Sequence, residues 1–401
     1  MGLEKQRSHP TGGRYYFLFF LILYTSICAS VAAYMMYYHV PSDLNAHIQI
    51  LLRFIETDAI PTPPIYYGLV YLLHFIMPYK EGFALAAVVV LTGAGFLKYG
   101  VSCRYLYTYC PGVGLRRVSL FAFLLMFFAP ITLFCYEGDL WYLAKFTPLI
   151  WHNSTTLLSL PFCVFLFYSA VKYIENRSDS VLWKILLISV IIVLIKPSFI
   201  FSFLPAFPLT LLLLDKRWSA DFFKVMALGV PLVAIIIVEK ILIYNTNPIL
   251  VHLEDGLVGG IGIKPFFLWL QYSESLGWDI ISSFMFPFVF VVAYWKRLLQ
   301  DPHIILSSLL VLFGLVIYFA LVETGSRLMD GNFFWQVILT LFVAYLVLVK
   351  HLLNICFASH SIDFSKKGLS LKNVFLLGLF FVHVVGGIAY TLRIVTLHNI
   401  Y

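Results

Sequence analysis

Hydrophobic and polar positions alternate along this chain in long blocks. Apolar runs of membrane-spanning length recur from end to end, and short polar or basic segments separate them. The clearest runs lie at about 15–37, 118–136, 154–171, 224–244, 278–295, 303–322, 333–350 and 373–392. Because a lipid bilayer forces a spanning segment to satisfy its own backbone, these blocks predict α-helices. We expect an all-α, polytopic membrane protein with about 11–12 transmembrane helices.

One apolar stretch, at 182–214, is too long for a single span. It is interrupted near its middle by Lys196-Pro197-Ser198, and proline disfavours helical geometry in the residue before it. Because a span needs about 20 residues, we expect two helices, at about 182–195 and 199–214, that meet at this break.

Basic residues set the expected orientation, since lysine and arginine favour inner loops. They gather in the N-terminal segment and at 172–184, 216–224, 296–297 and 350–372, which we place inside. Alternation then places 39–62, 137–153, the Lys196 break, 245–276 and 323–332 outside. Two outer segments, 39–62 and 137–153, must be separated by an even number of crossings. Three apolar runs lie between them, at 63–78, 82–98 and 118–136, so either 63–78 does not cross or a short crossing lies within 99–112.

Two modules are expected on this basis. Residues 1–215 form an N-terminal transmembrane module with the first external loop at 39–62, and residues 216–401 form a C-terminal module with external loops at 245–276 and 323–332. The glycine-rich part of 245–276 is not followed by the GK[ST] of a phosphate-binding loop, so we interpret it as an external loop.

Composition excludes a soluble fold. Of 401 residues, 61% are hydrophobic and 12% are charged, and the mean hydropathy is +0.91. The net charge of +7 reflects the basic inner loops and gives no indication of nucleic-acid binding. Six scattered cysteines without a CxxC pair predict neither a disulfide framework nor a metal site.

The first external loop carries the first candidate site. Ser42 is placed to cap a helix that begins with Asp43, and His47 lies one turn later on the same face. An apolar stripe beginning at Leu44 and Ile48 occupies another face, which predicts an amphipathic helix on the membrane surface. The alternative is a connector in which Asp43 only complements the positive helix end.

Three more polar groups fall on the same predicted side. His152 and Asn153 open a helix at the outer surface, although a cap beside an interfacial tryptophan would have this sequence too. Lys196 and Ser198 lie at the corner of two apolar helices, where an ammonium beside free N–H groups suits an anion, although a lysine can also snorkel.

The last group runs from Glu323 to Trp335 and includes Arg327 and Asn332 in a glycine-punctuated turn. An internal salt bridge between Glu323 and Arg327 is the alternative to a binding role. Together the four groups supply carboxylates, cations and histidines beside a lipid-facing body. That combination favours chemistry on a lipid-linked anionic substrate, with Asp43 as base and Lys196 and Arg327 stabilising a departing phosphate.

These stretches resemble the GT-C superfamily of integral-membrane glycosyltransferases. Members have an acidic residue in the first external loop directly after the first span, and Asp43 occupies that position. His47 stands where many members have a second acid, and no large soluble C-terminal domain follows. The resemblance implies transfer of a hexosyl or pentosyl group from a polyprenyl-phosphate donor, with Asp43 as base or acceptor-orienting residue.

The resemblance also implies partners and a location. The donor would be a polyprenyl-phosphate-linked sugar, and the acceptor a glycan, lipid or protein. A multi-pass protein of a bacterial inner membrane is expected, with its active site facing the periplasm or exterior, embedded in the lipid bilayer and without a nucleic-acid partner. No cofactor is certain, and a divalent metal is left open.

Two other classes of function fit an apolar chain with polar outer loops. A flippase or transporter of lipid-linked saccharides would need charges distributed along a path through the helices, together with repeat symmetry. A saccharide polymerase or ligase uses lipid-diphosphate donors, normally with a large external loop. The charges here lie mostly at outer helix ends and no repeat is evident, which favours the glycosyltransferase.

Overall fold

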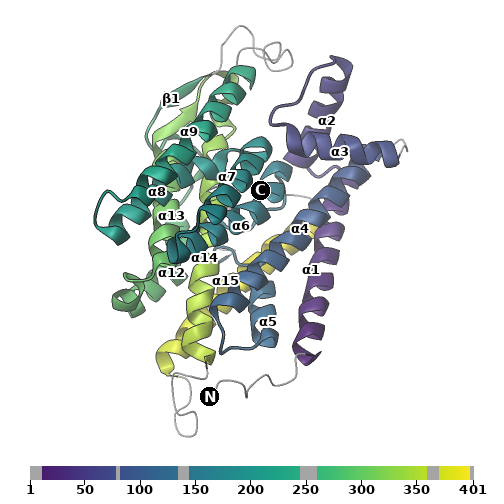
Figure 1. Ribbon diagram of the computed structural model, residues 1–401. Helices are drawn as coiled ribbons and strands as arrows, with labels where there is room; N and C mark the ends of the chain where they lie inside the picture. Colours follow the sequence, from purple (N-terminus) through teal and green to yellow (C-terminus); the bar gives the residue numbers. More distant parts are fainter. Residues whose placement is uncertain (1–10, 78–81, 134–143, 244–259, 359–369, 398–401) are drawn as a thin grey trace.

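The computed structural model describes residues 11–77, 82–133, 144–243, 260–358 and 370–397 (Figure 1). The predicted external segments 137–153 and 245–276 lie partly outside these residues, at 137–143 and 245–259. The elements are α1 (Thr11–Tyr37), α2 (Asp43–Glu56), α3 (Pro64–Ile76), α4 (Gly82–Tyr109), α5 (Leu115–Leu125), α6 (Ser154–Asn176), α7 (Asp179–Ile195), α8 (Ser198–Asp215), α9 (Ala220–Ile241), β1 (Ile261–Ile263), α11 (Phe267–Tyr272), α12 (Leu276–Leu298), α13 (Pro302–Ala320), β2 (Leu321–Glu323), η3 (Gly325–Met329), η4 (Asn332–Phe334), α14 (Trp335–Phe357) and α15 (Leu371–Leu397).

The all-α, polytopic class is confirmed. Within the described ranges, nine helices are long and apolar enough to cross a membrane. Helix α7 has 17 residues and a mostly apolar sequence, so its length of about 25 Å makes it a tenth candidate. The shorter helices α3 and α5 have 13 and 11 residues, which is below the length of a complete span.

The break at Lys196 has the predicted form. Helix α7 ends at Ile195 and α8 begins at Ser198, which confirms two helices over this stretch. Lys196 adopts an extended backbone conformation, with φ of −168° and ψ of 113°, and Pro197 caps the new helix. The extended residue turns the chain between two antiparallel helices and leaves its side chain at their shared end.

The predicted span at 118–136 differs from the structure. Helix α5 ends at Leu125, and the chain continues as irregular backbone through Leu133. The α15 glycines Gly386 and Gly387 explain why this irregular segment fits here, because a Cβ at either would meet a carbonyl oxygen of Pro130 or Phe127, at 2.4 and 1.8 Å. The backbone N–H groups of Ala129 and Ile131 donate hydrogen bonds to backbone carbonyls of α15 and α12. Polar backbone groups that are buried at membrane depth require such partners.

Helix α3 resolves the odd number of runs. Figure 1 draws α3 across the upper ends of α1 and α4 and not alongside them. Residues 82–109 form one continuous helix, α4, so no separate crossing lies within 99–112. An α3 that does not cross is the alternative under which the helices alternate and the predicted inner side receives Arg116 and Arg117, as their charge favours.

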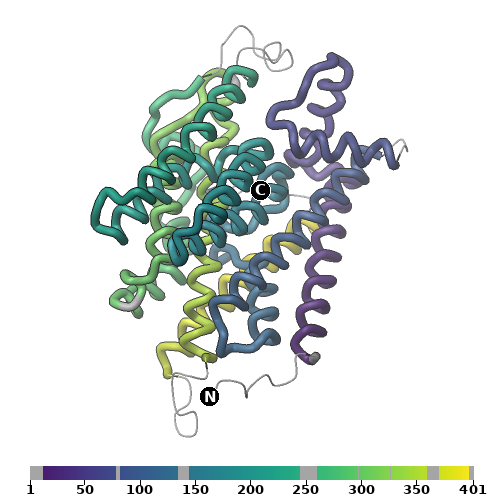
Figure 2. Tube along the Cα trace, in the orientation of Figure 1, coloured from purple at the N-terminus to yellow at the C-terminus, as the bar shows by residue number. Residues whose placement is uncertain are grey.

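The core centres on α6 and α14. In their spanning windows, 78% and 89% of residues are buried, against 22% in α9, which faces outward. Helices α1 and α4 lie side by side in Figures 1 and 2, and Gly95 allows the close approach because a Cβ there would meet the Cys28 sulfur at 2.4 Å. The division near residue 215 stays a prediction, and α8 of the first half packs on α13 and α14 of the second.

Candidate functional site

Helix α2 carries Asp43 and His47 toward the start of α6. Its buried stripe of Leu44, Ile48, Leu51 and Phe54 fixes which face turns outward. Asp43 Oδ2 accepts a hydrogen bond from Asn153 Nδ2 at 2.5 Å. His47 Nδ1 is hydrogen-bonded to the Ser154 hydroxyl. The two predicted residues of the first loop therefore contact consecutive residues at the beginning of α6.

Asn153 is the N-cap of α6, and its side chain joins three elements. Its Oδ1 accepts from the backbone N–H of Thr156 at 2.9 Å, which satisfies a free donor at the helix start. The same oxygen accepts from Lys196 Nζ at 3.2 Å, and Lys196 also donates to Thr155 Oγ1 at 3.3 Å. One side-chain amide thus lies between the carboxylate of Asp43 and the ammonium of Lys196.

Lys196 lies against an aromatic ring and away from paired carboxylates. Its ammonium lies 4.7 Å from the ring centroid of Trp335, the first residue of α14. Burial lowers the pKa of Lys196 to about 7, although attraction by Asp43 opposes the effect. Within the described part of the chain, no carboxylate oxygen lies within ion-pairing distance of this ammonium.

Two histidines border the same space. The His152 ring lies 5.6 Å from Trp335, centroid to centroid, and His47 lies 5.8 Å from both Tyr66 and Tyr67. Burial lowers the pKa of both His47 and His152 to about 4. Both imidazoles are therefore neutral near pH 7, where they can donate or accept hydrogen bonds but add no charge. We call Asp43, His47, His152, Asn153 and Lys196 the outer polar cluster.

Glu323, Arg327 and Asn332 form a neighbouring group above α14. Glu323 is the last residue of β2, and pairing of β2 with β1 places it opposite Ile261. Arg327 lies 3.5 Å from Glu323 and 3.3 Å from Asp330, and Asn332 donates to Glu323 at 2.5 Å. These charges are close enough to affect the pKa of Lys196. Two carboxylates nevertheless compensate Arg327, and the pair with Glu323 is the one that the alternative interpretation expected.

Ser198 is the least connected of the predicted residues. It begins α8 and is 5% exposed, two residues after Lys196. Across the described ranges, no side-chain hydrogen bond links Ser198 to the outer polar cluster. Its part in the site therefore stays a prediction.

Several buried polar atoms near the outer polar cluster lack protein partners in the described structure. They are Oγ of Ser42, Oγ1 of Thr156, and both side-chain amide atoms of Gln336. Ser42 precedes Asp43, Thr156 lies in the first turn of α6, and Gln336 follows Trp335. Buried polar groups are normally hydrogen-bonded, so these atoms call for water or a polar ligand.

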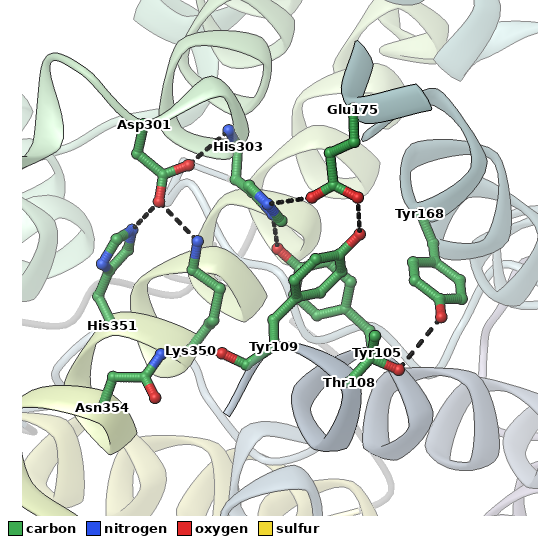
Figure 3. A network of polar contacts seen from close by, with 10 residues as sticks. All are labelled: Tyr105, Thr108, Tyr109, Tyr168, Glu175, Asp301, His303, Lys350, His351 and Asn354. Atoms are coloured by element: carbon green, nitrogen blue, oxygen red, sulfur yellow. Dashed lines mark hydrogen bonds and ion pairs between the residues drawn. The ribbon is translucent and has the colours of Figure 1, made fainter. Parts of the chain in front are cut away.

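A second polar cluster lies at the opposite ends of α6 and α14 (Figure 3). Asp301 accepts from Lys350 Nζ at 2.6 Å, lies 2.9 Å from His351 Nε2, and accepts from the backbone N–H of His303 at 2.7 Å. Glu175 lies 3.6 Å from His303 Nε2. We call these five residues the inner polar cluster.

Tyrosines of α4 complete the inner polar cluster. Tyr105 bonds to His303 Nδ1 at 2.6 Å, and Tyr109 donates to Glu175 at 3.1 Å (Figure 3). Although burial opposes ionisation, the hydrogen bond from His351 and the charge of Lys350 hold the pKa of Asp301 below its ordinary range. Four helices and the α12–α13 connection are joined here through paired charges and hydrogen bonds.

Sequence reasoning missed the inner polar cluster. Lys350 and His351 belong to a basic segment that indicated only an inner loop, and Asp301 and His303 precede a run that indicated only a span. The available clue was an aspartate and a histidine two residues apart at a predicted inner helix start. The partners come from α4, α6 and α14, and no local pattern reveals those pairings.

A metal site has no support among the residues described. No group of three or more His, Cys, Asp or Glu side chains there is arranged to hold a metal ion. Comparison with protein-family models and with curated proteins finds no match to this chain. The findings establish a multi-pass helical membrane protein, and its activity must be argued from the site.

Proposed function

We propose that this protein is a membrane glycosyltransferase of the GT-C type. It moves a hexosyl or pentosyl group from a polyprenyl-phosphate donor to a glycan, lipid or protein acceptor on the outer face of the membrane. A bacterial inner membrane, with the site toward the periplasm or exterior, suits such a donor. The observation that carries the proposal is the shared contact of Asp43 and Lys196 with Asn153.

The proposed chemistry assigns each charge a task. Asp43 takes the proton of the acceptor hydroxyl as that oxygen attacks the sugar carbon, and the bond from this carbon to the phosphate oxygen breaks. Among the described residues, the side-chain hydrogen bond to Asp43 reaches Oδ2, which leaves Oδ1 for the acceptor. Lys196 donates to the departing phosphate and stabilises its charge.

The balance of charge favours a monophosphate donor. Lys196 has no carboxylate within ion-pairing distance among the described residues, whereas Arg327 is compensated by Glu323 and Asp330. Within the outer polar cluster, the one ammonium without an ion-paired carboxylate among the described residues matches the single negative charge of a sugar phosphodiester. A diphosphate carries a further charge and would call for a second free cation or a metal. This difference weighs against the polymerase or ligase alternative, whose donors are lipid diphosphates.

Polar atoms without protein partners support a sugar ligand. The hydroxyls of Ser42 and Thr156 and the amide of Gln336, which adjoin Asp43, the start of α6 and Trp335 in the sequence, offer donors and acceptors for a sugar. A sugar ring presents several hydroxyls that match such groups, and the Trp335 ring offers an apolar face. Glu323, Asn332 and Ser198 are the further candidate sugar contacts.

A flippase or transporter of lipid-linked saccharides is the second candidate. Lys98, in the middle of α4, favours it, because this ammonium is 4% exposed and lies 4.3 Å from the Phe342 ring. Ionisable groups at membrane depth often mark transport paths. Lys98 is nevertheless one cation within α4, and a transport path needs a series of such groups.

Transfer and transport can be separated in one experiment. Membrane vesicles containing the protein receive a polyprenyl-monophosphate-linked sugar with radiolabel in the sugar. We expect label to leave the lipid fraction and appear in an acceptor, while the matching diphosphate donor reacts far more slowly. Movement of intact labelled donor between leaflets, with no label released, would replace the glycosyltransferase by the flippase.

A further inference from the structure

We infer that Asn153 is a positioning residue that separates the Asp43 carboxylate from the Lys196 ammonium, and that it is not a contact for substrate. This inference rests on the proposed function and deepens it. The side chain of Asn153 is 3% exposed, and the protein itself occupies both ends of its amide.

The N-cap role fixes which way the amide points. The backbone N–H of Thr156 needs an acceptor at the start of α6, and Asn153 Oδ1 supplies it at 2.9 Å. Thr155 Oγ1 also donates to this oxygen, at 3.1 Å. Because the oxygen is turned toward α6, the amide nitrogen must face away from it, toward Asp43. The capping requirement of a helix therefore sets the geometry of the proposed base.

The amide then acts as a neutral spacer between opposite charges. Nδ2 donates to Asp43 Oδ2 at 2.5 Å, and Oδ1 accepts from Lys196 Nζ at 3.2 Å. In direct contact, the carboxylate and the ammonium would form a buried ion pair and engage each other. The carboxylate would then be a weaker base, and the ammonium would be less available to a phosphate. Asn153 holds both groups with one hydrogen bond each and leaves their charges available.

Other titratable groups around this unit come from several elements. They are His47 on α2, Tyr67 on α3, His152 before α6, and Glu323, Arg327 and Asp330 after α13. The two histidines are neutral near pH 7, and Arg327 is compensated by its carboxylates. The separation of Asp43 from Lys196 is therefore the main electrostatic feature that Asn153 controls.

Asn153→Ser tests the spacer without removing the cap. Serine is among the best N-cap residues, but its side chain is too short to reach both Asp43 and Lys196. With the amide absent, we expect attraction to bring the ammonium onto the carboxylate. The pKa of Lys196 then rises by about one unit or more, because an adjacent opposite charge favours the charged form.

The measurement is the pH dependence of Lys196 acetylation by acetic anhydride, quantified by mass spectrometry. It needs no donor, so it succeeds or fails independently of sugar transfer. Ser219→Ala, which removes the N-cap of α9, is the matched control and should leave the Lys196 midpoint unchanged. An unchanged midpoint in Asn153→Ser would overturn the spacer role, and Asp43 would remain a candidate base.

Activity gives a second, distinguishable result. In Asn153→Ser we expect kcat for sugar transfer to fall about tenfold or more, because a carboxylate engaged by the ammonium is less available to take the acceptor proton. If this variant does not fold, Asn153→Thr also retains a capping oxygen and is too short to reach both groups, so the Lys196 midpoint should rise in the same way, and an unchanged midpoint would overturn the spacer role. Absence of transfer by the unmodified protein would overturn the proposed function, whereas the labelling result would still decide the spacer.

Discussion

Two polar clusters occupy opposite ends of the same two helices, and they differ in how completely the protein satisfies them. The outer polar cluster lies at the starts of α6 and α14, where Lys196 lacks a paired carboxylate in the described structure and neighbouring polar atoms lack partners. The inner polar cluster lies at the ends of these helices, where Asp301 alone has three partners.

The difference separates a binding site from a structural connection. A buried charge with strong partners joins helices, whereas a buried charge without one is costly unless a ligand completes it. The inner polar cluster links α4, α6 and α14 to the α12–α13 connection and leaves little for a ligand. The outer polar cluster leaves a carboxylate oxygen and an ammonium available, which is what the proposed transfer needs.

The largest effect is expected from breaking the inner polar cluster. Asp301→Asn removes the charge that pairs with Lys350 and His351 and leaves a buried ammonium unpaired. We expect a loss of about 3–5 kcal/mol in stability, measured as thermal unfolding in detergent. Asp330→Asn is the control, because its pair with Arg327 is half exposed and should contribute less than about 1 kcal/mol.

The direction in which pH changes the stability that Asp301 contributes follows from its lowered pKa. Its stabilisation is present above the ordinary pKa of an aspartate, about 4, and is lost as the pH falls toward the folded value. Full stability of Asp301→Asn would contradict the structural role of the inner polar cluster. It would make that cluster a second candidate site.

Removing the outer cation should weaken binding and not folding. In Lys196→Met, the donor phosphate loses a charge-assisted hydrogen bond, so we expect donor affinity to fall about 10- to 100-fold. Stability should change little, because the variant also removes a partly buried charge that has no ion-paired carboxylate in the described structure. Lys224→Met on the inner side, which breaks an exposed pair with Asp179, is the matched control. Unchanged donor affinity in Lys196→Met would return Lys196 to a snorkelling role.

The lowered pKa of Lys196 predicts a pH dependence. Its ammonium is charged below about 7 and loses its proton above, so affinity for a phosphate should fall as the pH rises through that value. Well above it, the loss approaches about tenfold per pH unit. Lys196→Arg stays charged and should flatten the fall between pH 7 and 9. A fall that persists in the arginine variant would assign the titration to another group.

The smallest effect is expected at Arg327. Since Glu323 and Asp330 already compensate its charge, Arg327→Gln should lower donor affinity less than about threefold. Donor affinity measured in Arg327→Gln and in Lys196→Met under the same conditions ranks the two cations by their contribution to donor binding. A loss in Arg327→Gln equal to that in Lys196→Met would mean that the donor displaces these carboxylates, and the charge balance behind the monophosphate donor would be wrong.

Local sequence pattern predicted most of the helices. A spanning helix must be long enough and apolar enough to cross the bilayer and must form its own backbone hydrogen bonds, and these properties belong to one continuous segment. It located the break at Lys196 and the amphipathic helix at Asp43. It overextended the run at 118–136, since α5 ends at Leu125 for a tertiary reason, the contact of its irregular continuation with Gly386 and Gly387. Hydropathy alone carries no information about such a contact.

The candidate site was predictable in part from the order of the helices along the chain. Topology placed Asp43, His152 and Lys196 on one side of the membrane, and the structure brings them together around Asn153. Orientation alone could not reveal the compensation of Arg327 or the capping bond that orients the Asn153 amide. Nor could it reveal the pairing of Asp301 with Lys350, which are distant in sequence.

The most direct test is the rate of sugar transfer by Asp43→Asn, expressed per folded molecule, with a polyprenyl-monophosphate-linked sugar as donor. Asparagine keeps the size of the side chain and removes the base, so we predict that kcat falls at least about 100-fold while thermal unfolding is unchanged. Asp301→Asn, by contrast, should retain its kcat per folded molecule. Full activity in Asp43→Asn would contradict the central claim that the outer polar cluster is the site of transfer.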